Sequence, residues 1–267
     1  MRHDPLRHRR NLTAVVALLC CAGLASAHQQ AGSTSDQSPA FVDQALAELG
    51  SDTPEEILRR QAAGRFRPMS ASDRAQLARE VRAMPNFSRL SEVRPDDAIS
   101  RRLAAGVLPA LRFEGRGGSM EVLVFSTRTP IISCYGDSVL ILSTGLLEGL
   151  SDDELLAAVS HELAHGWYIE ETALARQSRD AERLKVIELK CDAVAVLMML
   201  SLRRDPSALL SALDAVDARL RQLYGADYLA RCDSRKHPTL TARRLFYARF
   251  LAQIRGAAVK RGAPASR

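Results

Sequence analysis

The feature that most constrains this chain is a pair of histidines four residues apart, His161 and His165. The residues ahead of them predict a helix, because Ser151 followed three positions later by Glu154 forms a capping box and apolar residues then recur at helical spacing. Positions i and i+4 lie on one face of a helix, so both imidazoles can reach a single metal ion. The fold must therefore accommodate a helix that carries metal-binding side chains.

Glu162 completes the pattern His-Glu-x-x-His. Zinc accepts neutral imidazole nitrogen, and a catalytic zinc site uses three protein ligands plus a water molecule. Glu162 lies beside such a metal, where it can take a proton from the activated water and return it to a leaving amine. The alternative is a chance match on an amphipathic helix, but apolar surroundings make two unliganded histidines costly. The pattern predicts one Zn²⁺ per chain, with His161 and His165 as ligands and Glu162 as general base.

A third ligand must come from another segment. The next predicted helix, over about 181–202, presents Glu188 and Asp192 one turn apart and then becomes apolar, so unpaired carboxylates would be costly there. We expect Glu188 to complete the triad and Asp192 to accept an N–H from a ligand histidine. A metzincin arrangement needs glycine and histidine where this chain has Tyr168 and Glu171. The competing candidates for the third ligand are Glu170, Glu171 and Glu182.

The rest of the chain predicts a mainly α fold with a small antiparallel β-sheet (α+β). Ala, Leu and Arg are abundant and aromatic residues scarce, which favours helix. Segments rich in β-branched and apolar residues at 121–127 and 139–143 predict two short strands. Further helices are expected to begin near Pro54, Ser72, Asp96, Asp205 and Thr239, the last of them ending at about Ile254.

The N-terminus is typical of a secretory signal. Arginines precede an apolar run over 12–24 that is too short for a comfortable membrane span, and Ala25-Ser26-Ala27 supplies a cleavage site. We therefore expect a periplasmic protein, the alternative being an uncleaved anchor in the inner membrane. The predicted organisation is a signal peptide (1–27), a flexible linker (28–40), a helical prefix (41–113), a zincin-like core (114–256) and a disordered basic tail (257–267).

Charge and cysteine content limit the partners. The signal peptide carries half of the formal charge of +6, so the remainder is only mildly basic, and we expect no nucleic-acid partner. No later apolar run is long enough to span a membrane after signal cleavage. Three cysteines remain, Cys134, Cys191 and Cys232, which allow at most one disulfide. Cys191 is expected to be a small buried thiol.

Beyond His-Glu-x-x-His and Glu-x-x-x-Asp, the chain carries His237-Pro238-Thr239 with Arg243 six positions after the histidine. Together with the segments 142–147 and 153–161, these motifs resemble the HtpX and CAAX-prenyl-protease type of zinc metallopeptidase, over about 120–250. The resemblance implies a gluzincin fold, endopeptidase activity and zinc held by His161, His165 and Glu188. It also implies that His237 lies near the water or the developing oxyanion, supported by Arg243. Because membrane spans are lacking, the chain is most similar to the soluble periplasmic branch.

The predicted function is hydrolysis of peptide bonds in polypeptide substrates. The resemblance suggests misfolded outer-membrane or periplasmic proteins as those substrates. An extended substrate is expected to add to a strand at the edge of the cleft. That edge is assigned to Val139, Leu140, Ile141, Leu142 and Ser143. The alternative is a zinc-bearing chaperone-like or autoinhibited binding protein, with residues 168–183 over the metal and His237 in the fourth position.

Overall fold

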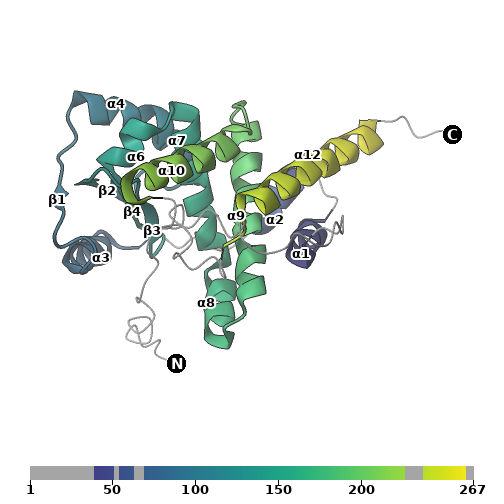
Figure 1. Cartoon of the computed structure of the whole chain (residues 1–267), viewed down its shortest axis with the longest axis horizontal. Helices are drawn as coiled ribbons and strands as arrows, with labels where there is room; N and C mark the ends of the chain where they lie inside the picture. The colour runs from purple at the N-terminus through teal and green to yellow at the C-terminus, as the bar shows by residue number, and fades with distance from the viewer. Residues whose placement is uncertain (1–38, 51–53, 63–68, 226–236, 263–267) are drawn as a thin grey trace.

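The computed structural model describes residues 39–50, 54–62, 69–225 and 237–262 of the 267-residue chain. Helices surround a four-stranded sheet, so the prediction of a mainly α fold with a small sheet is confirmed (Figure 1). The predicted signal peptide, the linker as far as residue 38, Cys232 and the last five residues of the tail lie outside the described residues.

The prefix consists of short helices that pack on the main body. Ser70 and Asp96 cap two of them by accepting hydrogen bonds from the backbone N–H groups of Asp73 and Ile99. Apolar side chains of the first and the last helix of this prefix belong to the same buried cluster as those of the central helices of the protein. The helices are α1 (Ala40–Leu49), α2 (Pro54–Ala62), α3 (Ala71–Ala83), α4 (Asp97–Gly106) and α5 (Leu108–Phe113).

The sheet is mixed, which corrects the prediction of a wholly antiparallel one. Its order is β1-β2-β4-β3, with β2 and β4 parallel and the two outer pairs antiparallel. The reason is the strand β3, which was not predicted: it follows β2 and precedes β4 in the chain and runs antiparallel to β4, so β2 and β4 run in the same direction. The strands are β1 (Ser91–Glu92), β2 (Glu121–Ser126), β3 (Ile132–Tyr135) and β4 (Val139–Ser143).

Two neighbouring helices form the centre of the molecule (Figure 1). The first begins at the predicted capping box, where the Ser151 side chain accepts from the N–H of Glu154 and Glu154 accepts from the N–H of Ser151. The second is buried over most of its length. The elements here are α6 (Thr144–Gly149), α7 (Asp152–Ala164), the 3₁₀ turn η3 (His165–Tyr168), α8 (Ile169–Ser178) and α9 (Ala181–Ser201).

Helices α10 (Ala208–Tyr224) and α12 (Leu240–Gly262) complete the described chain. Thr239 caps α12 by accepting from the N–H of Ala242. This helix continues beyond Ile254 and through the first residues of the segment that was predicted to be disordered. Its buried stripe extends to Ala257, and a single glycine inside a helix costs only about 1 kcal/mol, so Gly256 does not end it.

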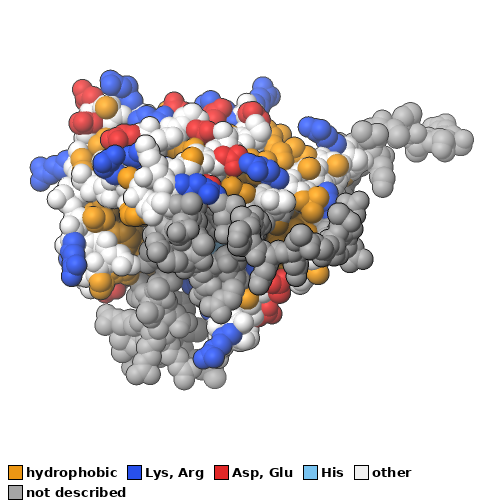
Figure 2. Space-filling model, viewed as in Figure 1, with side chains coloured by type: hydrophobic (Ala, Val, Ile, Leu, Met, Phe, Trp, Pro, Cys, Tyr) orange, Lys and Arg blue, Asp and Glu red, His pale blue; other side chains and the backbone are white. Residues whose placement is uncertain are grey.

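The described surface carries charges of both signs. On the face seen in Figure 2, basic and acidic side chains are interspersed over the upper part of the molecule rather than gathered in one patch. None of the helices within the described ranges combines the length and apolar character needed to cross a bilayer.

Candidate metal centre

Three predicted ligands meet between α7 and α9. Nε2 of His161 lies 3.3 Å from Nε2 of His165. Glu188 brings one carboxylate oxygen 3.6 Å from the first of these nitrogens and the other oxygen 3.8 Å from the second. One ligand atom from each residue lies within 4.8 Å of the other two, so the group can hold a metal ion. The competing carboxylates Glu170, Glu171 and Glu182 are not part of this group.

The site is buried. His161 is 2 % exposed and Glu188 5 % exposed, although neither is apolar. Glu162 is 1 % exposed, and its Oε1 has no hydrogen-bond partner among the described residues. Buried polar atoms are ordinarily satisfied, and an orphaned carboxylate oxygen beside three potential ligands is a strong reason to expect a further group in the site. The residues therefore fit a cation and a small polar ligand.

Asp192 and Arg243 hold the first histidine and the carboxylate ligand. Asp192 Oδ1 lies 2.9 Å from Nδ1 of His161, which leaves Nε2 directed to the site. The Arg243 guanidinium is 1 % exposed and donates both to Asp192 Oδ1 and, at 3.0 Å, to Glu188 Oε2. One cation thus fixes two carboxylates on successive turns of α9.

The second histidine has a different partner. Nδ1 of His165 lies 3.5 Å from Sγ of Cys191, which is a free buried thiol as expected. Burial raises the pKa of Cys191 well above its usual range, so the group remains a thiol at neutral pH. Sequence spacing offered a weak signal for this contact, because residue 191 lies on the helical turn after Glu188.

The electrostatic environment differs from one group to the next. Burial raises the pKa of Glu162 to about 8, an effect that His161 opposes. Burial disfavours protonation of His161, but the nearby carboxylates of Asp192 and Glu188 outweigh burial and raise the pKa of that histidine to about 9. For His165 burial prevails and lowers its pKa to about 3. The group therefore combines one basic and one weakly basic imidazole.

His237 reaches the edge of the ligand group from the residues that precede α12. Its Nδ1 lies 3.6 Å from Glu188 Oε1, and its side chain is half-buried. It does not belong to the set of three mutually close ligands. The structure thus brings a third imidazole against the carboxylate, from a position about 70 residues along the chain from the first two.

The predicted edge strand is wrong. β4 is buried and pairs with β2 on one side and β3 on the other, so its backbone cannot accept another strand. Among the described strands, β3 ends the sheet on this side. It also contacts the site, since the backbone N–H of Cys134 stabilises the Glu162 carboxylate. The Ile-Ile pair after Pro130 was the sequence signal for this strand.

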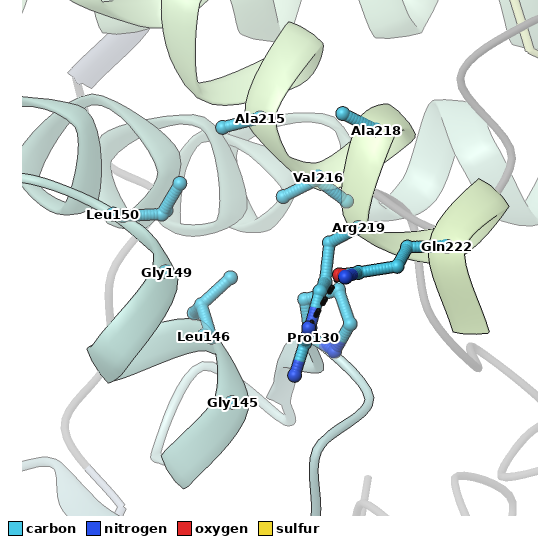
Figure 3. Close-up of a pocket in the computed structure, with 10 residues that line it drawn as sticks. All are labelled: Pro130, Gly145, Leu146, Gly149, Leu150, Ala215, Val216, Ala218, Arg219 and Gln222. Atoms are coloured by element: carbon cyan, nitrogen blue, oxygen red, sulfur yellow. Dashed lines mark hydrogen bonds between the residues drawn. The ribbon is translucent and has the colours of Figure 1, made fainter.

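An apolar groove lies apart from this group, between α6 and α10 (Figure 3). It has a volume of about 400 Å³, and Arg219, which lines it, donates a hydrogen bond to Gln222 Oε1. None of the predicted ligands lines it. The lining residues are Pro130, Gly145, Leu146, Gly149, Leu150, Ala215, Val216, Ala218, Arg219 and Gln222.

Comparison of the chain with protein-family models, with curated proteins and with solved structures found no match. The chemistry of the site therefore has to be argued from its own geometry.

Proposed function

We propose that the chain is a zinc-dependent endopeptidase of the HtpX and CAAX-prenyl-protease type, with one Zn²⁺ per chain. The observation that carries the proposal is the spacing of the donor atoms. Donors bound about 2.0–2.2 Å from zinc in a tetrahedral arrangement lie about 3.3–3.5 Å from one another. The separations among the ligand atoms of His161, His165 and Glu188 are 3.3, 3.6 and 3.8 Å.

The identity of the metal follows from the donor set. Two imidazole nitrogens and one carboxylate oxygen are the ligands of catalytic zinc sites that keep a fourth position for water. Structural zinc sites are normally closed by four ligands and are rich in cysteine, whereas the ligand group found among the described residues includes neither Cys134 nor Cys191. Zinc in such a site lowers the pKa of a bound water to about 7 and polarises a carbonyl group.

Glu162 is the proposed general base and acid. Its buried Oε1 has no partner among the described residues and is free to accept a proton, which it then returns to the leaving amine. Cys134 orients the carboxylate through its backbone N–H. His237, whose Nδ1 lies 3.6 Å from Glu188 Oε1, is the proposed hydrogen-bond donor to the oxyanion that forms on the carbonyl oxygen.

The proposed substrate is an extended polypeptide. Among the described strands β3 ends the sheet next to Glu162, and a substrate strand is proposed to pair along it while alternate side chains decide specificity. On the basis of the predicted signal peptide at 1–27, the proposed location is the periplasm, and misfolded outer-membrane or periplasmic proteins are the proposed substrates. Nucleic acid is not a proposed partner, and the mature protein is not proposed to span the membrane.

The test is cleavage of an unfolded polypeptide by the parent protein, by Glu162→Gln and by Asp153→Asn. Removal of the general base should lower turnover by at least about 100-fold while zinc binding persists. Asp153 lies on the same helix but is solvent-facing and pairs with Arg204, so its variant should cleave like the parent. A chelator should abolish cleavage, and added zinc should restore it. Equal turnover in Glu162→Gln and the parent would exclude the proposed mechanism.

A zinc-bearing chaperone-like or autoinhibited protein is the second candidate, because His237 already contacts the ligand carboxylate at 3.6 Å. If its imidazole took the fourth position, the site would be closed. His237→Ala separates the two proposals: a closed site gains cleavage on this substitution, whereas an open catalytic site loses it.

A further inference from the structure

A second buried charged cluster lies beside the metal centre, and none of the roles assigned above uses it. Arg116 is 1 % exposed and comes from the segment between α5 and β2. Its guanidinium nitrogens lie 3.6 Å from Glu114 Oε2 and 3.5 Å from Asp137 Oδ1, and it also donates to the Asp137 carbonyl. Burying such groups is costly, so a cluster of this kind calls for a specific role. We call these three residues the Arg116 cluster.

The Arg116 cluster contacts the two residues that follow the ligand His165. The indole N–H of Trp167 donates to Glu114 Oε2 at 3.0 Å. The Asp137 carboxylate lies directly against Gly166, where a Cβ atom would come within 2.1 Å of Oδ1. Glycine is therefore required at position 166 for the carboxylate to lie where it does.

The same cluster also contacts the strand that faces Glu162. Asp137 follows β3 in the tight turn to β4, where its own φ is +55°, a conformation that favours glycine or asparagine and aspartate. Three positions earlier, Cys134 presents its N–H to Glu162. The segment from Cys134 to Asp137 therefore meets α7 and η3 at two points, through Cys134 at Glu162 and through Asp137 at Gly166, the residue after the second histidine.

We propose that Asp137, held by Arg116, is a positioning residue that fixes the end of α7 and η3 against the β3–β4 turn, and so sets the placement of His165 relative to Glu162. The inference rests on the metal-binding part of the proposed function. Burial raises the pKa of both Glu114 and Asp137; the Trp167 hydrogen bond and Arg116 oppose the rise at Glu114, and Arg116 opposes it at Asp137. Loss of the contact would leave the ligand helix free to shift at its end.

Two variants act on this contact from opposite sides. Asp137→Asn keeps the size of the side chain and its tolerance of positive φ but removes its charge. Gly166→Ala changes none of the three side chains of the Arg116 cluster. The added methyl group should push the Asp137 carboxylate away from η3 and so also away from Arg116. Val42→Ala is the control, because Val42 is a fully buried residue of α1 and its truncation lowers stability without touching the turn.

The readouts are the zinc dissociation constant from competition with a chromophoric chelator, the absorption spectrum of the Co²⁺-substituted protein, and kcat and KM on an unfolded peptide. Misplacement of a ligand should raise the zinc dissociation constant about tenfold in both variants, shift the Co²⁺ spectrum and lower kcat, with KM within about twofold of the parent. Val42→Ala should leave the dissociation constant and the spectrum unchanged.

The proposal is overturned if Asp137→Asn folds and binds zinc with the affinity and the Co²⁺ spectrum of the parent. It is also overturned if Val42→Ala shifts both as far, because loss of stability alone would then explain the effect. If Asp137→Asn does not fold, Gly166→Ala decides the question by the same readouts. A parent protein that binds zinc but cleaves no peptide would contradict the proposed function and leave the positioning role to be judged from the dissociation constant and spectrum.

Discussion

Helix α9 carries buried charges of both signs within little more than one turn, and its two faces use them differently. On one face, Glu188 and Asp192 point to α7 and α12, where they meet His161 and Arg243. On the other face, Lys190 points to α1 and α8. Its ammonium group lies 3.1 Å from Glu48 and 3.0 Å from Glu171.

The distances show what separates the two faces. Around Lys190 the contacts have hydrogen-bond lengths, and the ammonium also lies 4.5 Å from the centre of the Tyr168 ring, so its charge is satisfied by side chains alone. The Glu188 oxygens lie 3.6 and 3.8 Å from the imidazole nitrogens of the two histidines, which is too long for hydrogen bonds. These separations suit ligand atoms that bind the same metal ion. A burial pattern alone would not distinguish a structural network from a ligand set, whereas the spacing of the polar atoms does.

The largest effect on the metal-binding face of α9 is expected from removal of the carboxylate ligand. Glu188→Gln should lower zinc affinity by at least about 100-fold, because an amide oxygen is a poor zinc ligand. Mutation of residues that only support the ligands already lowers metal affinity by about 10–100-fold. Competition with a chromophoric chelator measures the change. Glu182→Gln, an exposed carboxylate on the same helix, should bind zinc like the parent. Equal affinity in Glu188→Gln and the parent would remove Glu188 from the ligand set.

A smaller loss of zinc affinity is expected from removal of the Arg243 guanidinium, which lies behind the ligands. Arg243→Met should lower zinc affinity about 10–100-fold, because Glu188 and Asp192 lose the group that holds them. The free energy of unfolding of the metal-free protein should fall by about 3–5 kcal/mol in urea denaturation. The neighbouring Arg244 pairs with Asp214 on the surface, so Arg244→Met serves as the control. If the two variants behaved alike, the bridging role of Arg243 would be refuted.

The pH dependence should be opposite for the metal-bound and metal-free protein. The pKa of His161 is raised to about 9 by Asp192 and Glu188 against the effect of burial, so zinc must displace a proton from it at neutral pH. Zinc affinity should therefore increase about tenfold per pH unit between pH 7 and pH 9. The contribution of the same group to metal-free stability is complete below about pH 6.5 and is lost as the pH rises to about 9. A zinc affinity independent of pH across this range would contradict the shift.

The smallest effect is expected from a substitution on the opposite face of α9, at Lys190. Lys190→Met leaves Glu48 and Glu171 without their shared partner, but both carboxylates are 28 % exposed and can be hydrated. We expect a loss of about 1–3 kcal/mol in the free energy of unfolding and no change in zinc affinity. Urea denaturation and chelator competition measure the two quantities on the same sample. A tenfold change in zinc affinity would show that the two faces are coupled.

Much of the site could be predicted because its information is local. The spacing of His161 and His165 puts both on one face of a helix, and Ser151 and Glu154 mark where that helix begins. The same reasoning applies to Glu188 and Asp192 on α9. Periodicity and capping are properties of a few consecutive residues, so α7 and α9 were predicted with nearly correct bounds. Helices α6 and α8 were not predicted, and α12 continues past its predicted end at about Ile254. Strand β3 was not predicted because it has only four residues. The residues between the two predicted strands were interpreted as a turn instead.

By itself, the sequence determined that two helices carry a set of metal-ligand side chains and that a small sheet accompanies them. Only the tertiary structure decided which strand ends the sheet, that Cys191 lies behind His165, and that Arg116 holds Asp137 against Gly166. These contacts join residues from different elements, and pairing between distant segments depends on how the elements pack rather than on the residues beside each one. The sequence shows which residues are charged, but the packing of the elements decides which of them are buried and which residue each one contacts.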